Sequence, residues 1–316
     1  MPDTKSIILG TRGSDLALAQ ATMTEAALRE HGIAVEIRVI KTIGDKRPDL
    51  KLTEFADHGV VDKGVFTKEL EEALMADEID IAVHSLKDVP TEIADAFVIP
   101  CTLPRAPIED VILTKQQGLF AEPTGLDRIV ATSSVRRARM MKHLFPGLTV
   151  EDIRGNVPTR IRKLVESDSW DGILLARAGL VRLGILDPAD DADGFDFEGT
   201  RIHTKILDPT EFIPAAGQGA VAIECRKNDD VALGALAKIN HEPTFRRIEA
   251  ERAFLAALKA GCQTPVGAHT WFEGDELAMR VRVFDEEDEA SEPVEGEVRG
   301  DDPVVMADVL MEQISK

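Results

Sequence analysis

The sequence has few cysteines and no long apolar run, and each shortage excludes a class of protein. Its three cysteines, Cys101, Cys225 and Cys262, form neither a disulfide framework nor a metal-ligand spacing, and the first two are predicted to lie in the core. This usage is typical of the reducing cytoplasm, where we expect the protein. No run of about 18 apolar residues is present, which predicts that nothing spans a membrane. The first residues lack the pattern of a secretory signal, so we expect none.

Basic residues are scarce relative to acidic ones. The chain has 37 Lys and Arg against 57 Asp and Glu, a formal net charge of −20. A phosphate backbone would be repelled over most of such a surface, which argues against nucleic-acid binding. The charge suits a salty cytoplasm, where screening weakens self-repulsion, and a halophilic origin is our hypothesis. Arginines that cluster against this acidic background are therefore candidates for binding an anion.

A phosphate-binding loop is absent as well. Gly59 and Gly64 have its spacing, but Val65 stands where the motif requires lysine. No internal repeat is present, and 316 residues exceed one ordinary core, which indicates two or three domains. We therefore predict the fold from the order of the apolar segments along the chain.

The first such segment, residues 6–10, is typical of a buried strand, and residues 16–31 have a helical pattern. Ser14 or Asp15 between them is a natural helix N-cap, so free amide groups and Arg12 would face one spot. An anion site and a plain strand–turn–helix corner explain this pattern equally well.

A second corner follows the strand predicted at residues 80–83. Ser85, Lys87 and Asp88 come soon after it, and ligands of open α/β sheets lie beyond the carboxyl ends of strands. An Asx turn ahead of the next proline, with a solvated lysine, is the competing interpretation.

Three further strands, predicted at residues 128–131, 149–153 and 172–176, each run into a helix start that carries arginine. Helix starts attract anions, and arginine adds a two-pronged donor suited to carboxylates. Three such corners in one predicted sheet indicate a ligand with several negative charges. The candidate binding residues of these corners are Thr132, Ser133, Ser134, Arg136, Arg137, Arg154, Gly155, Asn156, Arg160 and Arg182.

The rest of the chain contains a crossover and a terminal α+β segment. Residues 187–200 are predicted to form an acidic surface loop, and residues 212–220 a small, flexible crossover in which Gln218 is a possible ligand contact. A helix predicted at residues 243–260 leads to Cys262, and alternating strands and a closing helix follow. Cys262 is either a covalent attachment point or a small apolar residue that caps this helix.

Several strings together resemble one family closely, the hydroxymethylbilane synthases, also called porphobilinogen deaminases. The resemblance runs nearly end to end, although residues 51–62 are unfamiliar and longer than this family leads us to expect. The matching strings are residues 11–14 (TRGS), 63–70 (KGVFTKEL), 84–90 (HSLKDVP), 132–137 (TSSVRR), 154–160 (RGNVPTR), 180–184 (LVRLG), 215–220 (AAGQGA) and 261–265 (GCQTP).

The resemblance implies two α/β lobes similar to those of periplasmic binding proteins, plus a smaller C-terminal α+β domain. We expect residues 1–103 with 217–238 to form the first lobe, and residues 104–216 the second. Residues 239–316 would form the third domain, which carries Cys262.

The resemblance also implies a chemistry. In the family a cysteine, here Cys262, holds a dipyrromethane cofactor through a thioether. Four porphobilinogen molecules are condensed head to tail with loss of ammonia, and hydrolysis releases hydroxymethylbilane. Asp88 would protonate the leaving amine and stabilise the cationic azafulvene-like intermediate. The acetate and propionate groups of the pyrroles would be bound by Arg12, Ser14, Lys63, Ser85, Lys87, Thr132, Ser133, Ser134, Arg136, Arg137, Arg154, Gly155, Asn156, Arg160, Arg182 and Gln218.

Two other functions remain open on the residues alone. A two-lobed anion-binding module without catalysis would leave Asp88 and Cys262 idle, and a cysteine hydrolase pairing Cys262 with His269 has only sequence proximity behind it. His84 is interpreted as a structural histidine. We expect a monomeric cytoplasmic transferase of porphyrin and haem biosynthesis that takes porphobilinogen and binds no metal, nucleic acid or membrane.

Overall fold

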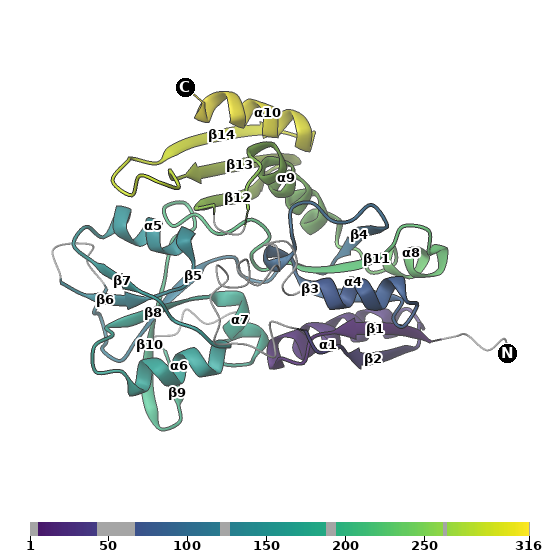
Figure 1. The fold of residues 1–316 in the computed structure, drawn as a ribbon, viewed down its shortest axis with the longest axis horizontal. Coiled ribbons are helices and arrows are strands. Elements are labelled where there is room, and N and C mark those ends of the chain that lie inside the picture. The colour runs from purple at the N-terminus through teal and green to yellow at the C-terminus, as the bar shows by residue number, and fades with distance from the viewer. Residues whose placement is uncertain (1–5, 43–66, 121–126, 188–193, 262–263, 316) are drawn as a thin grey trace. The chain divides into compact units, whose positions relative to one another are not determined.

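The computed structural model describes residues 6–42, 67–120, 127–187, 194–261 and 264–315. The chain divides into two compact units, Met1–Ala106 with Gly219–Ile248 and Pro107–Gln218 with Glu249–Lys316 (Figure 1). The division into three domains stays a prediction.

The first unit contains a five-stranded sheet of order β2-β1-β3-β11-β4. The first three strands are parallel, whereas β11 is antiparallel to both β3 and β4. The bounds are β1 Ile7–Thr11, β2 Val35–Val39, β3 Ile81–Ser85, β4 Phe97–Thr102 and β11 Val221–Arg226.

Helices cover both faces of this sheet, because its strands alternate apolar side chains between two cores. Ile81 and Val83 of β3 belong to the core formed with α1 (Asp15–Glu30) and α8 (Asp230–Leu236). Ala82 faces the opposite core, with α4 (Lys68–Met75). Side chains of a strand alternate between its two faces, so His84, two residues after Ala82, also lies on the α4 side.

The second unit contains a six-stranded sheet of order β7-β6-β8-β5-β10-β9. Its parallel strands are β7, β6 and β8, and β5 is antiparallel to β8 and to β10. The bounds are β5 Asp110–Thr114, β6 Ile129–Ala131, β7 Thr149–Glu151, β8 Gly172–Ala176, β9 Phe195–Phe197 and β10 Thr200–Ile206. Helix α5 (Val135–Leu144) packs on one face, and α6 (Val157–Glu166) with α7 (Arg177–Arg182) packs on the other.

The two sheets share one plan. In each, three parallel strands are followed by an antiparallel strand that enters directly after a crossover, β11 in the first sheet and β5 in the second. This arrangement, with helices on both faces, confirms the expectation of two α/β lobes.

The C-terminal part is an antiparallel sheet of order β12-β13-β14 covered by helices. The strands are β12 Val266–Glu273, β13 Glu276–Val283 and β14 Val294–Gly300, and the helices are α9 Glu242–Leu258 and α10 Pro303–Ile314. Phe254 of α9 and Leu310 of α10 pack with Met279 of β13 in one core. The predicted α+β segment is therefore confirmed.

One prediction about the second sheet is wrong. Residues 187–200 were expected to form a loop, but Phe195–Phe197 is strand β9, with Phe195 buried, and it pairs with β10. The turn between the strands, Glu198 and Gly199, has two positive φ values, 48° and 85°, as a tight hairpin requires. The alternation of Phe and Asp carries the strand signal here, and the acidic composition obscures it.

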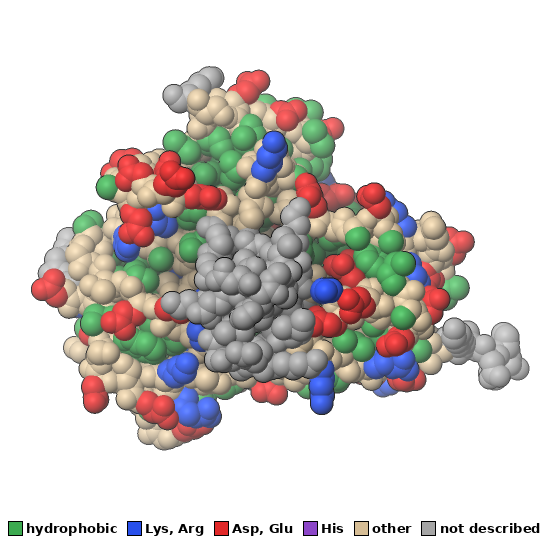
Figure 2. Space-filling model, in the orientation of Figure 1, with side chains coloured by type: hydrophobic (Ala, Val, Ile, Leu, Met, Phe, Trp, Pro, Cys, Tyr) green, Lys and Arg blue, Asp and Glu red, His purple; other side chains and the backbone are tan. Residues whose placement is uncertain are grey.

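Acidic side chains are spread over the visible face among those of Lys and Arg (Figure 2). In the described part of the chain, no helix combines the length and the apolar character needed to cross a membrane.

Candidate active site

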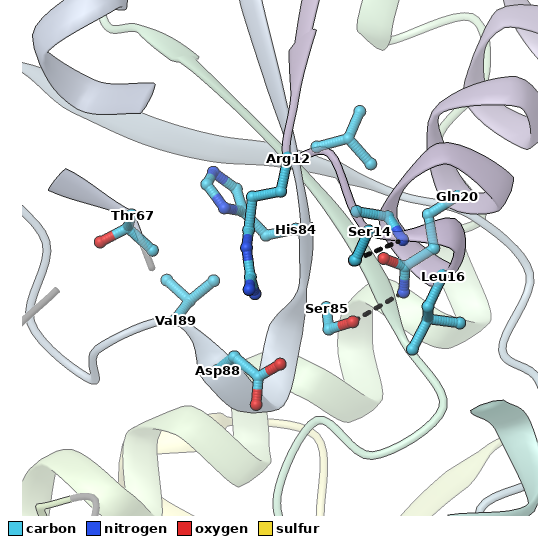
Figure 3. A pocket seen from close by; sticks show the side chains of 11 residues that line it. Arg12, Ser14, Leu16, Gln20, Thr67, His84, Ser85, Asp88 and Val89 are labelled. Atoms are coloured by element: carbon cyan, nitrogen blue, oxygen red, sulfur yellow. Dashed lines mark hydrogen bonds between the residues drawn. The ribbon is translucent and has the colours of Figure 1, made fainter. Parts of the chain in front are cut away.

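A pocket lies where β1 and β3 end, and it brings together four of the predicted site residues (Figure 3). Arg12 and Ser14 follow β1, whereas Ser85 is the last residue of β3 and Asp88 comes shortly after it. The full lining is Arg12, Ser14, Leu16, Ala17, Gln20, Thr67, Val83, His84, Ser85, Asp88 and Val89. The carboxyl ends of parallel strands meet at one edge of the sheet, which explains why distant segments converge here.

The start of helix α1 forms one wall of this pocket. Ser14 is its N-cap, and the Ser14 hydroxyl accepts a hydrogen bond from the Ala17 amide at 3.3 Å. One turn further on, the Gln20 side-chain amide donates to the Ser85 hydroxyl at 2.7 Å. This bond joins the helix to the end of β3 within the lining of the pocket.

Asp88 stands on a short 3-10 turn, Leu86–Asp88, directly after β3. The buried Leu86 anchors the turn, and Asp88 itself is exposed. Figure 3 shows the Arg12 side chain extending past His84 toward Asp88. The neighbouring Lys87 is exposed and is not part of the pocket lining.

His84 has the partner that its interpretation as a structural histidine requires. Its Nε2 lies 2.9 Å from a carboxylate oxygen of Glu224, and both side chains are buried. Glu71 of α4 is also close to this pair. Burial raises the pKa of Glu71, as does the charge of Glu224, while a hydrogen bond with Thr67 and the His84 charge lower it. The α4 face of the sheet therefore holds a small cluster of titratable groups.

In the second unit, Arg136 and Arg137 share one buried carboxylate. Arg136 Nη2 lies 2.8 Å from Asp110 Oδ2, and Arg137 contacts Asp110 Oδ1 through Nε at 2.8 Å and Nη2 at 2.7 Å. Burial lowers the pKa of Arg136, Asp110 raises it and Arg137 lowers it. Two guanidinium groups against one carboxylate leave a positive charge at the start of α5.

The three hydroxyl residues before these arginines fix the start of the helix. Ser134 is the N-cap of α5 and accepts a hydrogen bond from the Arg137 amide at 3.4 Å. Thr132 accepts from the Ser134 amide at 3.2 Å, and Ser133 donates to the carbonyl of Ile153. All three therefore shape the loop that would receive an anion.

The next corner is built in a similar way around α6. Asn156 is its N-cap and accepts from the Thr159 amide at 3.0 Å. Gly155 has a φ of 119°, and a Cβ there would meet Thr159 at 2.7 Å, so only glycine fits. Arg160 Nε donates to the Gly155 carbonyl at 2.7 Å, and Arg154 Nε lies 3.1 Å from Asp152. Both arginines are thus held at the helix start.

Arg182 and Gln218 complete the predicted set within the described residues. Burial lowers the pKa of the Arg182 guanidinium to about 10. Gln218 is buried, and its side-chain amide donates to Ile108 O at 2.7 Å and to Asp110 Oδ1 at 3.2 Å. Gln218 therefore joins the crossover to the same carboxylate that holds the two arginines.

Two predicted residues, Lys63 and Cys262, lie outside the described residues. The remaining cysteines behave as core residues, as predicted. Cys101 and Cys225 are both buried, and burial raises the pKa of the first to about 12 and of the second to about 11. Neither thiol is a nucleophile under ordinary conditions.

Sequence reasoning missed Gln20, Asp110 and Glu224. Gln20 and Glu224 are buried polar side chains, 2% and 0% exposed, within otherwise apolar patterns. A polar residue at an apolar position of a helix or strand is the signal that could have found them. Asp110 begins a buried strand, and no local pattern relates it to the arginines that follow much later in the chain.

Comparison with known proteins completes the description. The family model for "Porphobilinogen deaminase, dipyromethane cofactor binding domain" matches residues 7–233, and the one for "Porphobilinogen deaminase, C-terminal domain" matches residues 245–315. A porphobilinogen deaminase of Nitrobacter hamburgensis is 44% identical over 87% of this chain and 82% of its own length. Those of Rubrobacter xylanophilus and Halalkalibacterium halodurans are 41% and 40% identical over 94% and 99% of this chain and 90% and 96% of their own lengths.

Among solved structures, substrate binding domain 2 of Lactococcus lactis GlnP, in an open conformation, aligns with 80% of this chain and 94% of that chain. Its sequence identity to this chain is 12% and the TM-score is 0.44. This likeness is too distant to support a conclusion about the fold beyond the sheets described above.

These matches define a transferase with a dipyrromethane cofactor-binding domain. The chain belongs to the porphobilinogen deaminase family. The predicted family, enzyme class, activity and cofactor are therefore confirmed.

Proposed function

We propose that the protein condenses four porphobilinogen molecules head to tail on a dipyrromethane primer held by Cys262, with loss of ammonia and hydrolytic release of hydroxymethylbilane. The observation that carries this proposal is the pocket in which Arg12, Ser14, Ser85 and Asp88 converge, in a chain of this family. It supplies a cation for a carboxylate, neutral donors, and one exposed carboxylate for the chemistry.

The residues of the second unit fit an acidic cofactor. Arg136 and Arg137 retain a net positive charge beside Asp110, and the Nε atom of Arg136 is buried without a hydrogen-bond partner in the described part of the chain. Burial lowers the pKa of the Arg182 guanidinium, and a carboxylate bound near it would favour its charged form. When bound, the dipyrromethane supplies the fixed primer to which incoming pyrroles are joined.

Asp88 does the chemistry in this proposal. It donates a proton to the leaving amine of porphobilinogen and then stands as a carboxylate beside the carbon cation that remains. Proton transfer of this kind contributes about two to four decades in rate, and a carboxylate placed where positive charge develops adds to it. The exposure of Asp88 on the turn after β3 leaves it accessible to a substrate.

The cations and neutral donors hold the acetate and propionate groups. Arginine suits this task because its fork matches a carboxylate, and helix starts add their amide groups. The cation roles belong to Arg12, Arg136, Arg137, Arg154, Arg160, Arg182, Lys63 and Lys87, and the neutral roles to Ser14, Ser85, Thr132, Ser133, Ser134, Gly155, Asn156 and Gln218.

We also infer the setting in which the enzyme works. The net charge of −20 favours a monomer in a salty cytoplasm, because like-charged copies repel and salt screens the repulsion within one copy. The same charge disfavours nucleic acid. We further propose that residues 239–316 form a third domain, which carries Cys262.

Intact-protein mass tests the proposal. The purified protein, denatured and weighed, should exceed its translated mass by two porphobilinogens less two ammonias, and the Cys262→Ala variant should show the translated mass alone. A wild-type protein that carries no adduct and releases no ammonia from porphobilinogen would contradict the proposal and leave an anion-binding module.

A further inference from the structure

A buried histidine and glutamate form a hydrogen-bonded pair in the wall of the Arg12–Asp88 pocket. His84 Nε2 lies 2.9 Å from Glu224 Oε2, and the side chains are 4% and 0% exposed. His84 of β3 is opposite Ala222 of β11, and Glu224 is two residues further along β11. The two side chains are therefore diagonal neighbours on one face of the sheet.

The second ring nitrogen of His84 is the one available to the pocket. Among the residues that the structure describes, His84 Nδ1 has no hydrogen-bond partner. Because Nε2 faces a carboxylate, it carries the proton of the neutral ring, and Nδ1 is then a proton acceptor. The ring lines the same pocket as Arg12 and Asp88 (Figure 3).

Stability alone does not explain a polar pair at this position. Replacing a buried ion pair by apolar residues of similar volume is often neutral or stabilising. The neighbours Ala82, Val83 and Ile223 belong to the hydrophobic cores on the two faces of the sheet. A base whose far nitrogen is held by a buried carboxylate is, in contrast, a recurring arrangement for proton transfer.

The reaction needs two proton transfers in each condensation. The C–N bond of the aminomethyl group breaks, its electron pair stays on nitrogen, and Asp88 gives the amine a proton. A C–C bond then forms between the freed methylene carbon and a pyrrole carbon. The C–H bond of that pyrrole carbon breaks, its electron pair restores the aromatic ring, and the proton requires an acceptor.

We propose that His84, held by Glu224, is that acceptor: Nδ1 takes the proton from the pyrrole carbon and returns it to Asp88. The return leaves Asp88 protonated and His84 neutral, so each cycle consumes porphobilinogen and releases one neutral ammonia. This inference rests on the proposed function and adds a second proton-handling residue to it.

The charged groups around His84 are consistent with this role. Arg12 and Asp88 share the pocket with it, Glu224 approaches from β11, and Glu71 approaches from α4. Burial and the Glu224 charge raise the pKa of Glu71, so Glu71 takes up a proton more readily than an ordinary glutamate. Glu224 is the carboxylate in hydrogen-bond contact with His84.

Two replacements of Glu224 separate a proton-transfer role from a packing role. Glu224→Gln keeps the shape and removes the charge, whereas Glu224→Asp keeps the charge and removes a methylene group. We expect Glu224→Gln to be slower than Glu224→Asp, with the acid limb of its kcat profile moved to lower pH because the imidazolium loses its carboxylate. His84→Asn should lower kcat about 100-fold with little change in KM.

Ring 15N shifts of His84 provide a readout that does not depend on turnover. The wild type should show the proton on Nε2, and Glu224→Gln should move proton population to Nδ1. The matched control is Glu251→Gln, since Glu251 is also 0% exposed and accepts from Gly217 N and Thr270 Oγ1. The Glu251→Gln variant should have a lower free energy of unfolding, but the acid limb of its kcat–pH profile should match that of the wild type.

The outcomes distinguish this inference from the proposed function. Suppose that every folded variant carries the dipyrromethane adduct. The role of His84 alone would then be overturned if Glu224→Asp were slower than Glu224→Gln. It would also be overturned if neither the pH dependence of kcat nor the ring 15N shifts changed. A wild type without adduct would overturn the proposed function instead. Should Glu224→Gln fail to fold, the pH profile and kcat of His84→Asn decide the question.

Discussion

Asp88 and Asp110 are the same side chain in opposite surroundings. Asp88 is exposed on a turn after β3, with Arg12 beside it in the pocket. Asp110 is 0% exposed, and Arg136, Arg137 and Gln218 all donate to it. The first carboxylate is accessible to a substrate, whereas the second already has its partners within the protein.

The difference indicates that the two carboxylates have separate roles, one structural and one chemical. A carboxylate saturated by arginines cannot exchange protons readily, but it can hold those arginines in one orientation. A carboxylate at a pocket with few donors can accept and release a proton. The arginines proposed to bind acidic pyrroles therefore need Asp110 to hold them, and the proposed chemistry needs a carboxylate that is not held in this way.

The largest expected effect comes from Asp88→Asn. This change should lower kcat by about two to four decades, since it removes both the proton donor and the negative charge. Stability, measured by urea unfolding, should change by less than about 0.5 kcal/mol because the side chain is exposed. The control is Asp95→Asn, another exposed aspartate of the same unit, and a near-normal rate for Asp88→Asn would remove it from the mechanism.

The second effect concerns stability and comes from Asp110→Asn. Removing the buried carboxylate leaves two guanidinium groups uncompensated and should cost about 3–5 kcal/mol of unfolding free energy. The control is Asp196→Asn, whose partner Arg201 is 3.6 Å away in an exposed pair, and it should cost less than about 1 kcal/mol. Equal urea midpoints for the two variants would contradict the structural role of Asp110.

The smallest effect compares the two helix caps. Ser14→Ala and Ser134→Ala each remove one hydrogen bond, to Ala17 N and Arg137 N, and should each cost about 1 kcal/mol in thermal unfolding. Because Ser134 also sets the direction of the helix that carries two arginines, its loss should reduce the fraction of protein with cofactor more than Ser14→Ala does. Equal adduct fractions would show that this positioning does not depend on the cap.

Much of the fold could be predicted from local pattern. The buried strand Gly172–Ala176 appears in the structure with the bounds expected from its apolar run. The helix that precedes Cys262 was expected because its apolar residues recur at helical spacing, and α9 confirms it. The strand Phe195–Phe197 was missed because three residues are too few for a periodic signal to outweigh an acidic composition.

The candidate site could be predicted residue by residue, but not as a set of contacts. Ser14 as a cap and Asp88 at a strand end follow from neighbouring residues. Gln20 and Ser85 are 65 residues apart, and His84 and Glu224 are 140 apart. No local rule relates such positions, because strand order and register decide which side chains meet.

By itself the sequence determined most of the elements, the clustering of arginine at helix starts, and the strings that place the chain in its family, because each depends on residues near one another in the chain. Only the tertiary structure decided that Asp110 is saturated and that Glu224 reaches His84. Those facts depend on which strand lies beside which, and burial of apolar faces from distant segments sets that order.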